Sequence, residues 1–161
     1  MRAIGHELTR RALLAAAAPI LAGAADPGAE AWDVVTAMAL ALGRGLDGEF
    51  LALCDPSLAG YSTLRANLAG LVAAADVESG IDPVKNEGDN AARDLEVDWQ
   101  LSLVDRSGLQ RVTRRRLVVK LRLEKRAGKW KAVALDPVAF FSPPSAGVNL
   151  ADQRGARRLL R

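Results

Sequence analysis

Side chains that carry much of enzyme chemistry are scarce in this chain. Its 161 residues include one histidine, His6, and one cysteine, Cys54. A Ser-His-Asp or Cys-His nucleophile needs an imidazole base, and a zinc site needs several cysteine or histidine ligands. One cysteine also excludes a disulfide within the chain. We therefore expect no metal site. Cys54 ends an apolar helical segment and is expected to be buried, with an intermolecular disulfide as the alternative.

Phosphate loops and membrane-spanning segments are missing as well. The glycines in residues 43–45 are too closely spaced for a phosphate loop and end a helical pattern. The acidic segment 82–90 lacks the spacing of a calcium-binding loop. The apolar run 12–22 has eleven residues, about half of the ~20 that a membrane-spanning helix needs. We expect no cofactor and no transmembrane segment in the mature chain.

Residues 1–24 have the pattern of a cleaved export signal. Arginines precede the apolar run, and a small-x-small site, Ala22-Gly23-Ala24, follows it. Residues 9–14 contain Arg10 and Arg11 and resemble the twin-arginine export motif. A first buried helix is the alternative. The sequence thus predicts an exported protein, periplasmic or secreted, whose mature form also lacks His6.

Acidic and basic residues are separated along the chain. Residues 26–105 carry a net charge of −11 and residues 106–161 one of +12. Such a separation can mark a surface for anionic polymers or membranes. The simpler explanation is that the two halves face each other within one sheet. The basic run 111–131 contains a single aromatic residue, Trp130, so nucleic acid is not an expected partner.

Three apolar stripes at helical spacing follow the export segment. The first stops at Gly43, and Asp47 is the expected cap of the second. Ser62 or Thr63 is the expected cap of the third. In chain order, the stripes consist of Trp32, Val35, Met38 and Leu42, then Phe50, Leu51 and Cys54, then Leu64, Leu68, Leu71 and Val72. Each stripe requires a partner surface.

From residue 77 onward the apolar period changes to two. Residues 77–85 contain a glycine and a proline, which fits an edge strand. Residues 95–103 alternate strictly, and 117–123 and 130–135 follow as further strands. Strands with one apolar side are typical of an antiparallel sheet covered on one face. The fold class is therefore α+β, with three N-terminal helices packed on a four-stranded sheet.

A short turn between the second and third strands sets their predicted register. Placing Asp105 opposite Leu109 puts an acidic strand beside a basic one, which accounts for part of the charge separation. The resulting pairs are Val97 with Leu117, Trp99 with Arg115, and Asp98 with Arg116. Near Gly128 a bulge would exchange Trp130 and Val133 between the two faces.

The chain thus divides into an export segment, 1–24, a domain, 25–142, and a basic tail, 143–161. The tail contains four arginines and few apolar side chains. We expect it to be mobile, with a short docked helix through Leu159 and Leu160 as the alternative.

The order of elements and the closing segment GKWKAVALDP, residues 128–137, resemble the nuclear transport factor 2-like superfamily. In this cystatin-like α+β fold a curved antiparallel sheet wraps around the helices and leaves a conical pocket. The resemblance covers about residues 29–142. Members include ketosteroid isomerase-like and dehydratase-like enzymes and association domains, so the fold alone decides no function.

Enzymes of this superfamily use pocket aspartates, tyrosines and often histidines. The mature chain has no histidine and a single tyrosine, so no acid–base pair can be carried over. Asp33 and Asp136 are weak catalytic candidates, with a surface or capping role as the alternative. Among seven aromatic residues, the ligand-binding candidates are Trp32, Tyr61 and Trp99.

Arg115 is the fourth ligand-binding candidate. The predicted register directs its side chain toward the apolar side of the sheet, near Trp99. A guanidinium group there could bind a carboxylate or phosphate, or stack on the indole. A bulge would return it to solvent.

Our leading hypothesis is an exported domain that binds a small ligand or a protein partner in a concave sheet pocket, without evident catalysis. An isomerase- or hydratase-type enzyme that uses a pocket aspartate is one alternative. A homodimer formed through the outer sheet face is the other.

Overall fold

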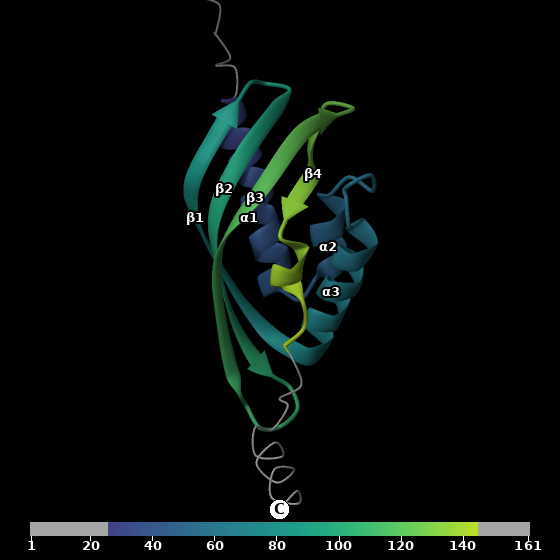
Figure 1. The fold of residues 1–161 in the computed structure, drawn as a ribbon, viewed down its shortest axis with the longest axis vertical. Helices are drawn as coiled ribbons and strands as arrows, with labels where there is room; N and C mark the ends of the chain where they lie inside the picture. The colour runs from purple at the N-terminus through teal and green to yellow at the C-terminus, as the bar shows by residue number, and fades with distance from the viewer. Residues whose placement is uncertain (1–25, 145–161) are drawn as a thin grey trace, which may run out of the picture.

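Three helices precede four strands in the computed structural model, which describes residues 26–144 (Figure 1). The elements are α1 (Pro27–Gly43), α2 (Asp47–Ala52), α3 (Tyr61–Ala74), β1 (Ala75–Gly88), β2 (Ala92–Asp105), β3 (Val112–Arg126), β4 (Lys129–Asp136) and the 3₁₀ helix η1 (Val138–Phe141). The predicted α+β class is confirmed. The export segment 1–24 and the tail beyond residue 144 lie outside the described residues. No helix in the described part has the length and apolar content to cross a membrane.

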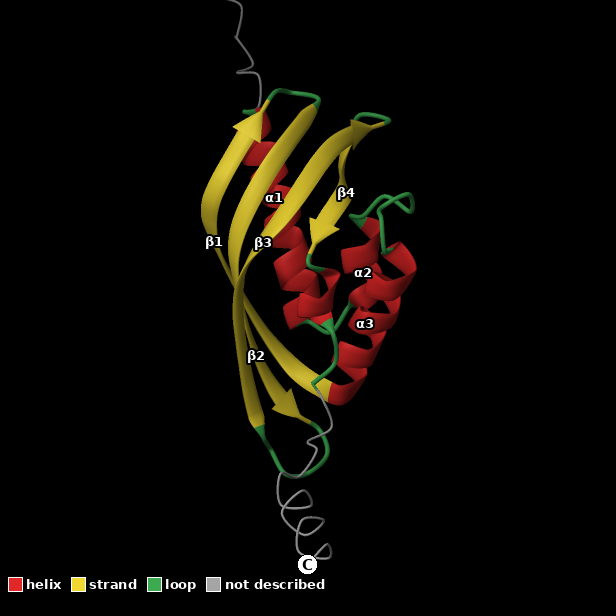
Figure 2. Ribbon diagram, viewed as in Figure 1, coloured by secondary structure: helices red, strands yellow, loops and turns green. Residues whose placement is uncertain are grey.

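The four strands form one antiparallel sheet in the order β1-β2-β3-β4. The sheet is curved and strongly twisted, and the helices lie on its concave side (Figure 2). β1 is an edge strand, as predicted. It is longer than expected because a bulge between Pro83 and Lys85 accommodates the proline within the ladder.

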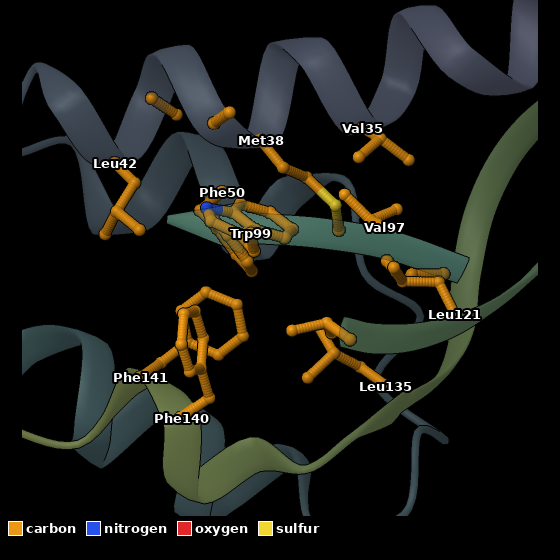
Figure 3. Packing of buried hydrophobic residues seen from close by; sticks show 14 of the residues in the cluster. Val35, Met38, Leu42, Phe50, Val97, Trp99, Leu121, Leu135, Phe140 and Phe141 are labelled. Carbon is orange, nitrogen blue, oxygen red and sulfur yellow. The ribbon is translucent and has the colours of Figure 1, made fainter. Parts of the chain in front are cut away.

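The core forms where the helical stripes meet the apolar side of the sheet. Val35, Met38 and Leu42 on α1 face Val97 and Trp99 on β2 (Figure 3). All five side chains are fully buried. The strict alternation in residues 95–103 is therefore confirmed as one buried and one solvent-facing row, since burial on one face drives this packing.

The predicted register between β2 and β3 is wrong by two residues. Trp99 pairs with Leu117, and Leu101 pairs with Arg115. The turn is longer than predicted, because the Asp105 amide donates to the Arg111 carbonyl at 2.9 Å and residues 106–110 form the loop. A shift of two residues keeps every side chain on its predicted face, whereas a shift of one would have reversed them all.

The predicted caps of the second and third helices are also wrong. Asp47 lies in the first turn of α2, and Leu46 is the N-cap without a side-chain bond. The carboxylate still favours the helix, because a negative charge near the N-terminus complements the helix dipole. Gly60 caps α3 with φ of 78°, a left-handed conformation that glycine adopts without strain.

β4 contains a bulge of the kind that the sequence analysis considered near Gly128. Ala134 pairs with Arg122 and Ala132 with Leu123, so Val133 is the extra residue of a bulge. As a result, Trp130 and Leu135 are both buried although they are separated by an odd number of positions. The bulge keeps the indole of Trp130 against the helices.

Candidate functional site

Aromatic rings pack against one another in the concave interior. The ring centroid of Trp99 lies 5.1 Å from that of Phe141 and 6.2 Å from that of Phe50 (Figure 3). The Trp99 indole NH donates to the Ser79 hydroxyl at 2.9 Å, which satisfies its one polar group. No polar or charged residue between positions 26 and 144 is buried. The interior therefore supplies apolar packing and no buried acid or base.

Arg115 lies on the inner side of the sheet, half-buried, as the predicted face required. Its guanidinium donates to the carbonyls of Phe140 at 3.0 Å, Pro143 at 3.1 Å and Ser142. Burial lowers the pKa of Arg115 from its ordinary value. These bonds hold the segment after β4 against β3 and position Phe141 in the core. Sequence reasoning missed this role, because the partners are backbone carbonyls some 25 residues away.

Tyr61 and Trp32 occupy two different places on the helical side. Tyr61 lines a hollow of about 440 Å³ together with Asp55, Arg126 and Lys131. Trp32 is half-buried on α1 and packs against the core. Trp99 is fully buried and lines neither this hollow nor the three others described below. The structure does not bring the predicted aromatic candidates together.

The two aspartate candidates lie on different surfaces. Asp33 is exposed on α1 and lines a hollow of about 420 Å³ with Lys125 and Lys129. Asp136 is exposed on the outer side of the sheet, paired with Lys120, in a hollow of about 360 Å³. Because the sheet separates them, they cannot act on one substrate as an acid–base pair.

A cluster that the sequence did not reveal joins the β3–β4 hairpin to α1. The Trp130 indole NH donates to the Glu30 carboxylate at 2.9 Å, and the Lys125 ammonium lies 3.0 Å from the same group. The Trp130 hydrogen bond and then Lys125 lower the pKa of Glu30. Lys125 also lies 5.1 Å from the Trp130 ring centroid, a cation–π distance. The cluster serves to attach the hairpin.

Cys54 is buried, as expected from its place in an apolar segment. Burial raises the pKa of its thiol to about 12, although Lys131 acts in the opposite direction. The neutral thiol is a poor nucleophile, because the thiolate is the reactive form. No group of three histidine, cysteine, aspartate or glutamate side chains within residues 26–144 is arranged to hold a metal ion.

The outer side of the sheet places acidic strands beside a basic one. Arg116 on β3 contacts the Asp98 carboxylate on β2 at 2.6 Å, and Arg122 contacts Asp94 at 3.0 Å. The Arg116 hydrogen bonds lower the pKa of Asp98. The explanation of the charge separation by strand pairing is thus confirmed. Asp98 and Arg116 meet diagonally, so this contact forms although the predicted register is wrong.

The largest exposed apolar side chains gather at one end of β3. Four of the six in the described part lie between positions 109 and 118: Leu109 (67% exposed), Val112 (55%), Leu117 (42%) and Val118 (42%). A hollow of about 470 Å³ adjoins them on the outer side, lined by Arg114, Arg116 and Gln100 among others. This end of β3 is the candidate functional surface. No sequence signal indicated it, because the predicted strands, residues 117–123 and 130–135, have nearly the same length.

Solved structures show which fold this is. The chain superposes on a nuclear transport factor 2-like superfamily protein from Salmonella enterica with a TM-score of 0.57 and 14% identity, covering 77% of this chain and 96% of that one. A ketosteroid isomerase-like protein from Erwinia carotovora gives 0.59 and 10%, covering 70% and 95%. A protein from Xanthomonas campestris, described as a calcium/calmodulin-dependent protein kinase II association domain, gives 0.56 and 17%, covering 82% and 94%.

The chain therefore has the nuclear transport factor 2-like fold, as the resemblance implied. No family model matches the sequence, and no curated protein matches it. Solved structures with this fold include an isomerase-like protein and an association domain, so the fold is compatible with both catalysis and assembly.

Proposed function

We propose that this chain is an exported, non-catalytic domain that binds a protein partner on its exterior. The observation that carries the proposal is the filled interior. Trp99, Phe50 and Phe141 pack against one another on the concave side of the sheet, the side on which the family resemblance implies a pocket. Small-molecule sites need a concave space with a few convergent polar groups, and the packed rings supply neither.

The exterior supports a protein partner. The buried centres of interfaces between proteins are more apolar than the rest of the surface, and arginine is enriched in interfaces; β3 exposes both apolar side chains and arginines at residues 112–118. The hollow beside this segment is open to solvent and is larger than the hollow that contains Asp33. An enzyme using Asp33 or Asp136 has less support, because the two carboxylates are exposed on opposite sides of the sheet.

Photo-crosslinking in living cells tests this function. A photoreactive amino acid replaces one exposed residue at a time on three elements: Leu40 on α1, Val84 on β1 and Leu117 on β3. We expect a discrete covalent complex with a second polypeptide from at least one position. A small molecule retained by the intact protein in native mass spectrometry contradicts the proposal, and so does the lack of a crosslink at all three positions.

The export part of the proposal rests on residues 1–24. Their arginines, apolar run and small-x-small site motivate it. Intact mass measurement after cell fractionation is expected to give a chain that begins at Ala25. Replacing Arg10 and Arg11 together by lysine is expected to leave an uncleaved cytoplasmic precursor, whereas Arg2→Lys is not. Cleavage of the double variant excludes the twin-arginine route, and an uncleaved natural chain excludes export by this signal.

A further inference from the structure

β3 extends past the end of β4 and leaves part of its length without a strand on that side (Figure 2). The last pair between the two strands joins Lys120 and Asp136. Within residues 26–144, no strand pairs with residues 112–119 on this side. We call residues 112–118 the open edge.

The register shows which backbone groups the open edge presents. The Arg111 carbonyl accepts from the Asp105 amide, so the residues of β3 that bond to β2 are every second one from Arg111. The amides and carbonyls of the residues between them point to the other side. At positions 120 and 122 these groups meet β4. At Val112, Arg114, Arg116 and Val118 they have no backbone partner in the described part of the chain.

The side chains of the open edge differ between its two faces. On the inner face Leu117 is 42% exposed, although it pairs with the fully buried Trp99. On the outer face Arg114 and Arg116 are neighbours, with Val112 and Val118 on either side of them. A row of unpaired backbone groups flanked by exposed apolar side chains is a template for another strand.

The charge of the open edge indicates which charge a binding partner should carry. Residues 112–118 contain three arginines and no acidic residue. Arg116 is paired with Asp98, whereas Arg114 has no ion pair within the described residues. An acidic segment is attracted here, and like charges directly opposite each other across two strands are destabilising.

We propose that the open edge binds an extended acidic segment of a partner protein as an added fifth strand. The inference rests on the proposed function and names the surface and the chemistry of the partner. Backbone hydrogen bonds to residues 112–118 provide the affinity, as in other cases of strand addition. Side chains of the partner alternate, with apolar residues beside Leu117 and carboxylates beside Arg114.

A second copy of this chain fits the open edge less well. An antiparallel pairing of the edge with itself, centred on Arg115, places Arg114 opposite Arg116 of the other copy. The chain's own residues 145–161 carry four arginines and one aspartate, so their charge is also unfavourable. An acidic partner segment can both form hydrogen bonds with the free backbone groups of the open edge and compensate its positive charge.

Fluorescence anisotropy with the full chain and synthetic peptides tests the added strand. The probe is a labelled peptide of about eight residues, long enough to span the open edge, in which glutamate alternates with valine or threonine. A peptide with lysine in place of glutamate is the charge control. N-methylation of every second amide, in each of the two possible phases, shows whether one row of peptide NH groups bonds to β3.

We expect the acidic peptide to bind and the lysine peptide not to bind. One phase of N-methylation is expected to abolish binding and the other to leave it nearly unchanged, because only one row of NH groups faces β3. Equal binding of the acidic and lysine peptides, or equal effects of the two phases, overturns the proposal. Failure of the acidic peptide to bind at all overturns it as well.

Matched variants locate the site on the protein. Arg114→Glu is expected to weaken binding by about tenfold, since the charge lies directly at the edge. Lys129→Glu makes the same change of charge at an exposed position of β4, at the far end of the β3–β4 hairpin, and is expected to change binding less than about twofold. Equal effects of the two variants, or binding unchanged by Arg114→Glu, overturn the assignment to the open edge.

The crosslinking experiment separates failure of this inference from failure of the proposed function. Crosslinks from Leu40 or Val84 without any from Leu117 leave a protein-binding domain whose site is elsewhere. A crosslink from Leu117 to a second copy of this chain would show that the open edge binds another copy and not an acidic partner. Either result overturns the inference alone.

Discussion

The two ends of β3 belong to one continuous strand but differ in burial. At residues 119–123 the inner side chains Val119, Leu121 and Leu123 are buried at 0–3% exposure, covered by the helices and flanked by β4. At residues 112–118 the same strand continues without β4, and Leu117 is 42% exposed. Alternation therefore defines the faces of a strand, while the neighbouring elements decide whether a face is buried.

Amide hydrogen exchange should show the largest difference between the two ends. The amides of Arg114 and Arg116 point to the open side and should exchange nearly as fast as in a free peptide. The amide of Arg122 bonds to β4 and should exchange only on global unfolding, more than about a thousandfold more slowly. NMR measures both in one experiment, with Leu117, bonded to β2, as the internal control. Equal protection of Arg114 and Arg122 would mean that the open edge is covered.

The second-largest difference is expected in the free energy of unfolding, between truncation of a buried apolar side chain and truncation of an exposed one. Trp99→Ala removes a fully buried indole that contacts Phe50 and Phe141, and should lower the free energy of unfolding by about 3–5 kcal/mol. Leu117→Ala, directly across the ladder, should cost less than about 1 kcal/mol, because much of its surface is already in water. Urea denaturation measures both. Similar losses would show that Leu117 belongs to the core.

Adjacent arginines of the open edge provide a finer comparison. Arg115→Met removes the hydrogen bonds to the carbonyls of Phe140, Ser142 and Pro143 and should cost about 1–3 kcal/mol of unfolding free energy. Arg114→Met should change it by less than about 0.5 kcal/mol, since no ion pair in the described part involves Arg114. Thermal and urea unfolding of the two variants measure the difference. If Arg115→Met costs as little as Arg114→Met, the segment after β4 is held by something other than Arg115.

The smallest expected effect concerns the Asp98–Arg116 pair. The folded-state pKa of Asp98 is lowered, so its contribution to stability is present above the unfolded pKa of about 3.9 and is lost as pH falls through the folded value. Asp98→Asn should therefore be less stable than the natural chain at pH 7, and the gap should close below about pH 4. In an Arg116→Gln background the pH-dependent gap should disappear. A gap that persists at pH 2 would assign the effect to packing.

The sequence predicted the elements that depend on local periodicity. The alternation in residues 95–103 determined the faces of β2 correctly, and the proline in residues 77–85 indicated an edge strand. The predicted face of Arg115 is correct although the predicted register is wrong by two residues, because an even shift leaves each side chain on the same face of the sheet. These features follow from side-chain direction alone, so no tertiary contact is needed to derive them.

The features that sequence reasoning missed depend on contacts between distant residues. The length of the 106–110 loop set the register, and no residue pattern specified it. The Glu30–Trp130 bond joins residues a hundred positions apart. The open edge results from two strand lengths, 15 residues for β3 and 8 for β4, and requires both ends of the hairpin to be known.

Cys54 gives the molecule a built-in reporter of its own unfolding. Its thiol, with a pKa of about 12 and almost no accessible surface, should remain unmodified by alkylating reagents at neutral pH for as long as the core is intact. Alkylation of Cys54 then occurs only when an unfolding event exposes the interior, and the alkylation rate reports how often such events occur. The same protection should keep the side chain reduced under oxidising conditions, so that the protein can be purified without a reducing agent.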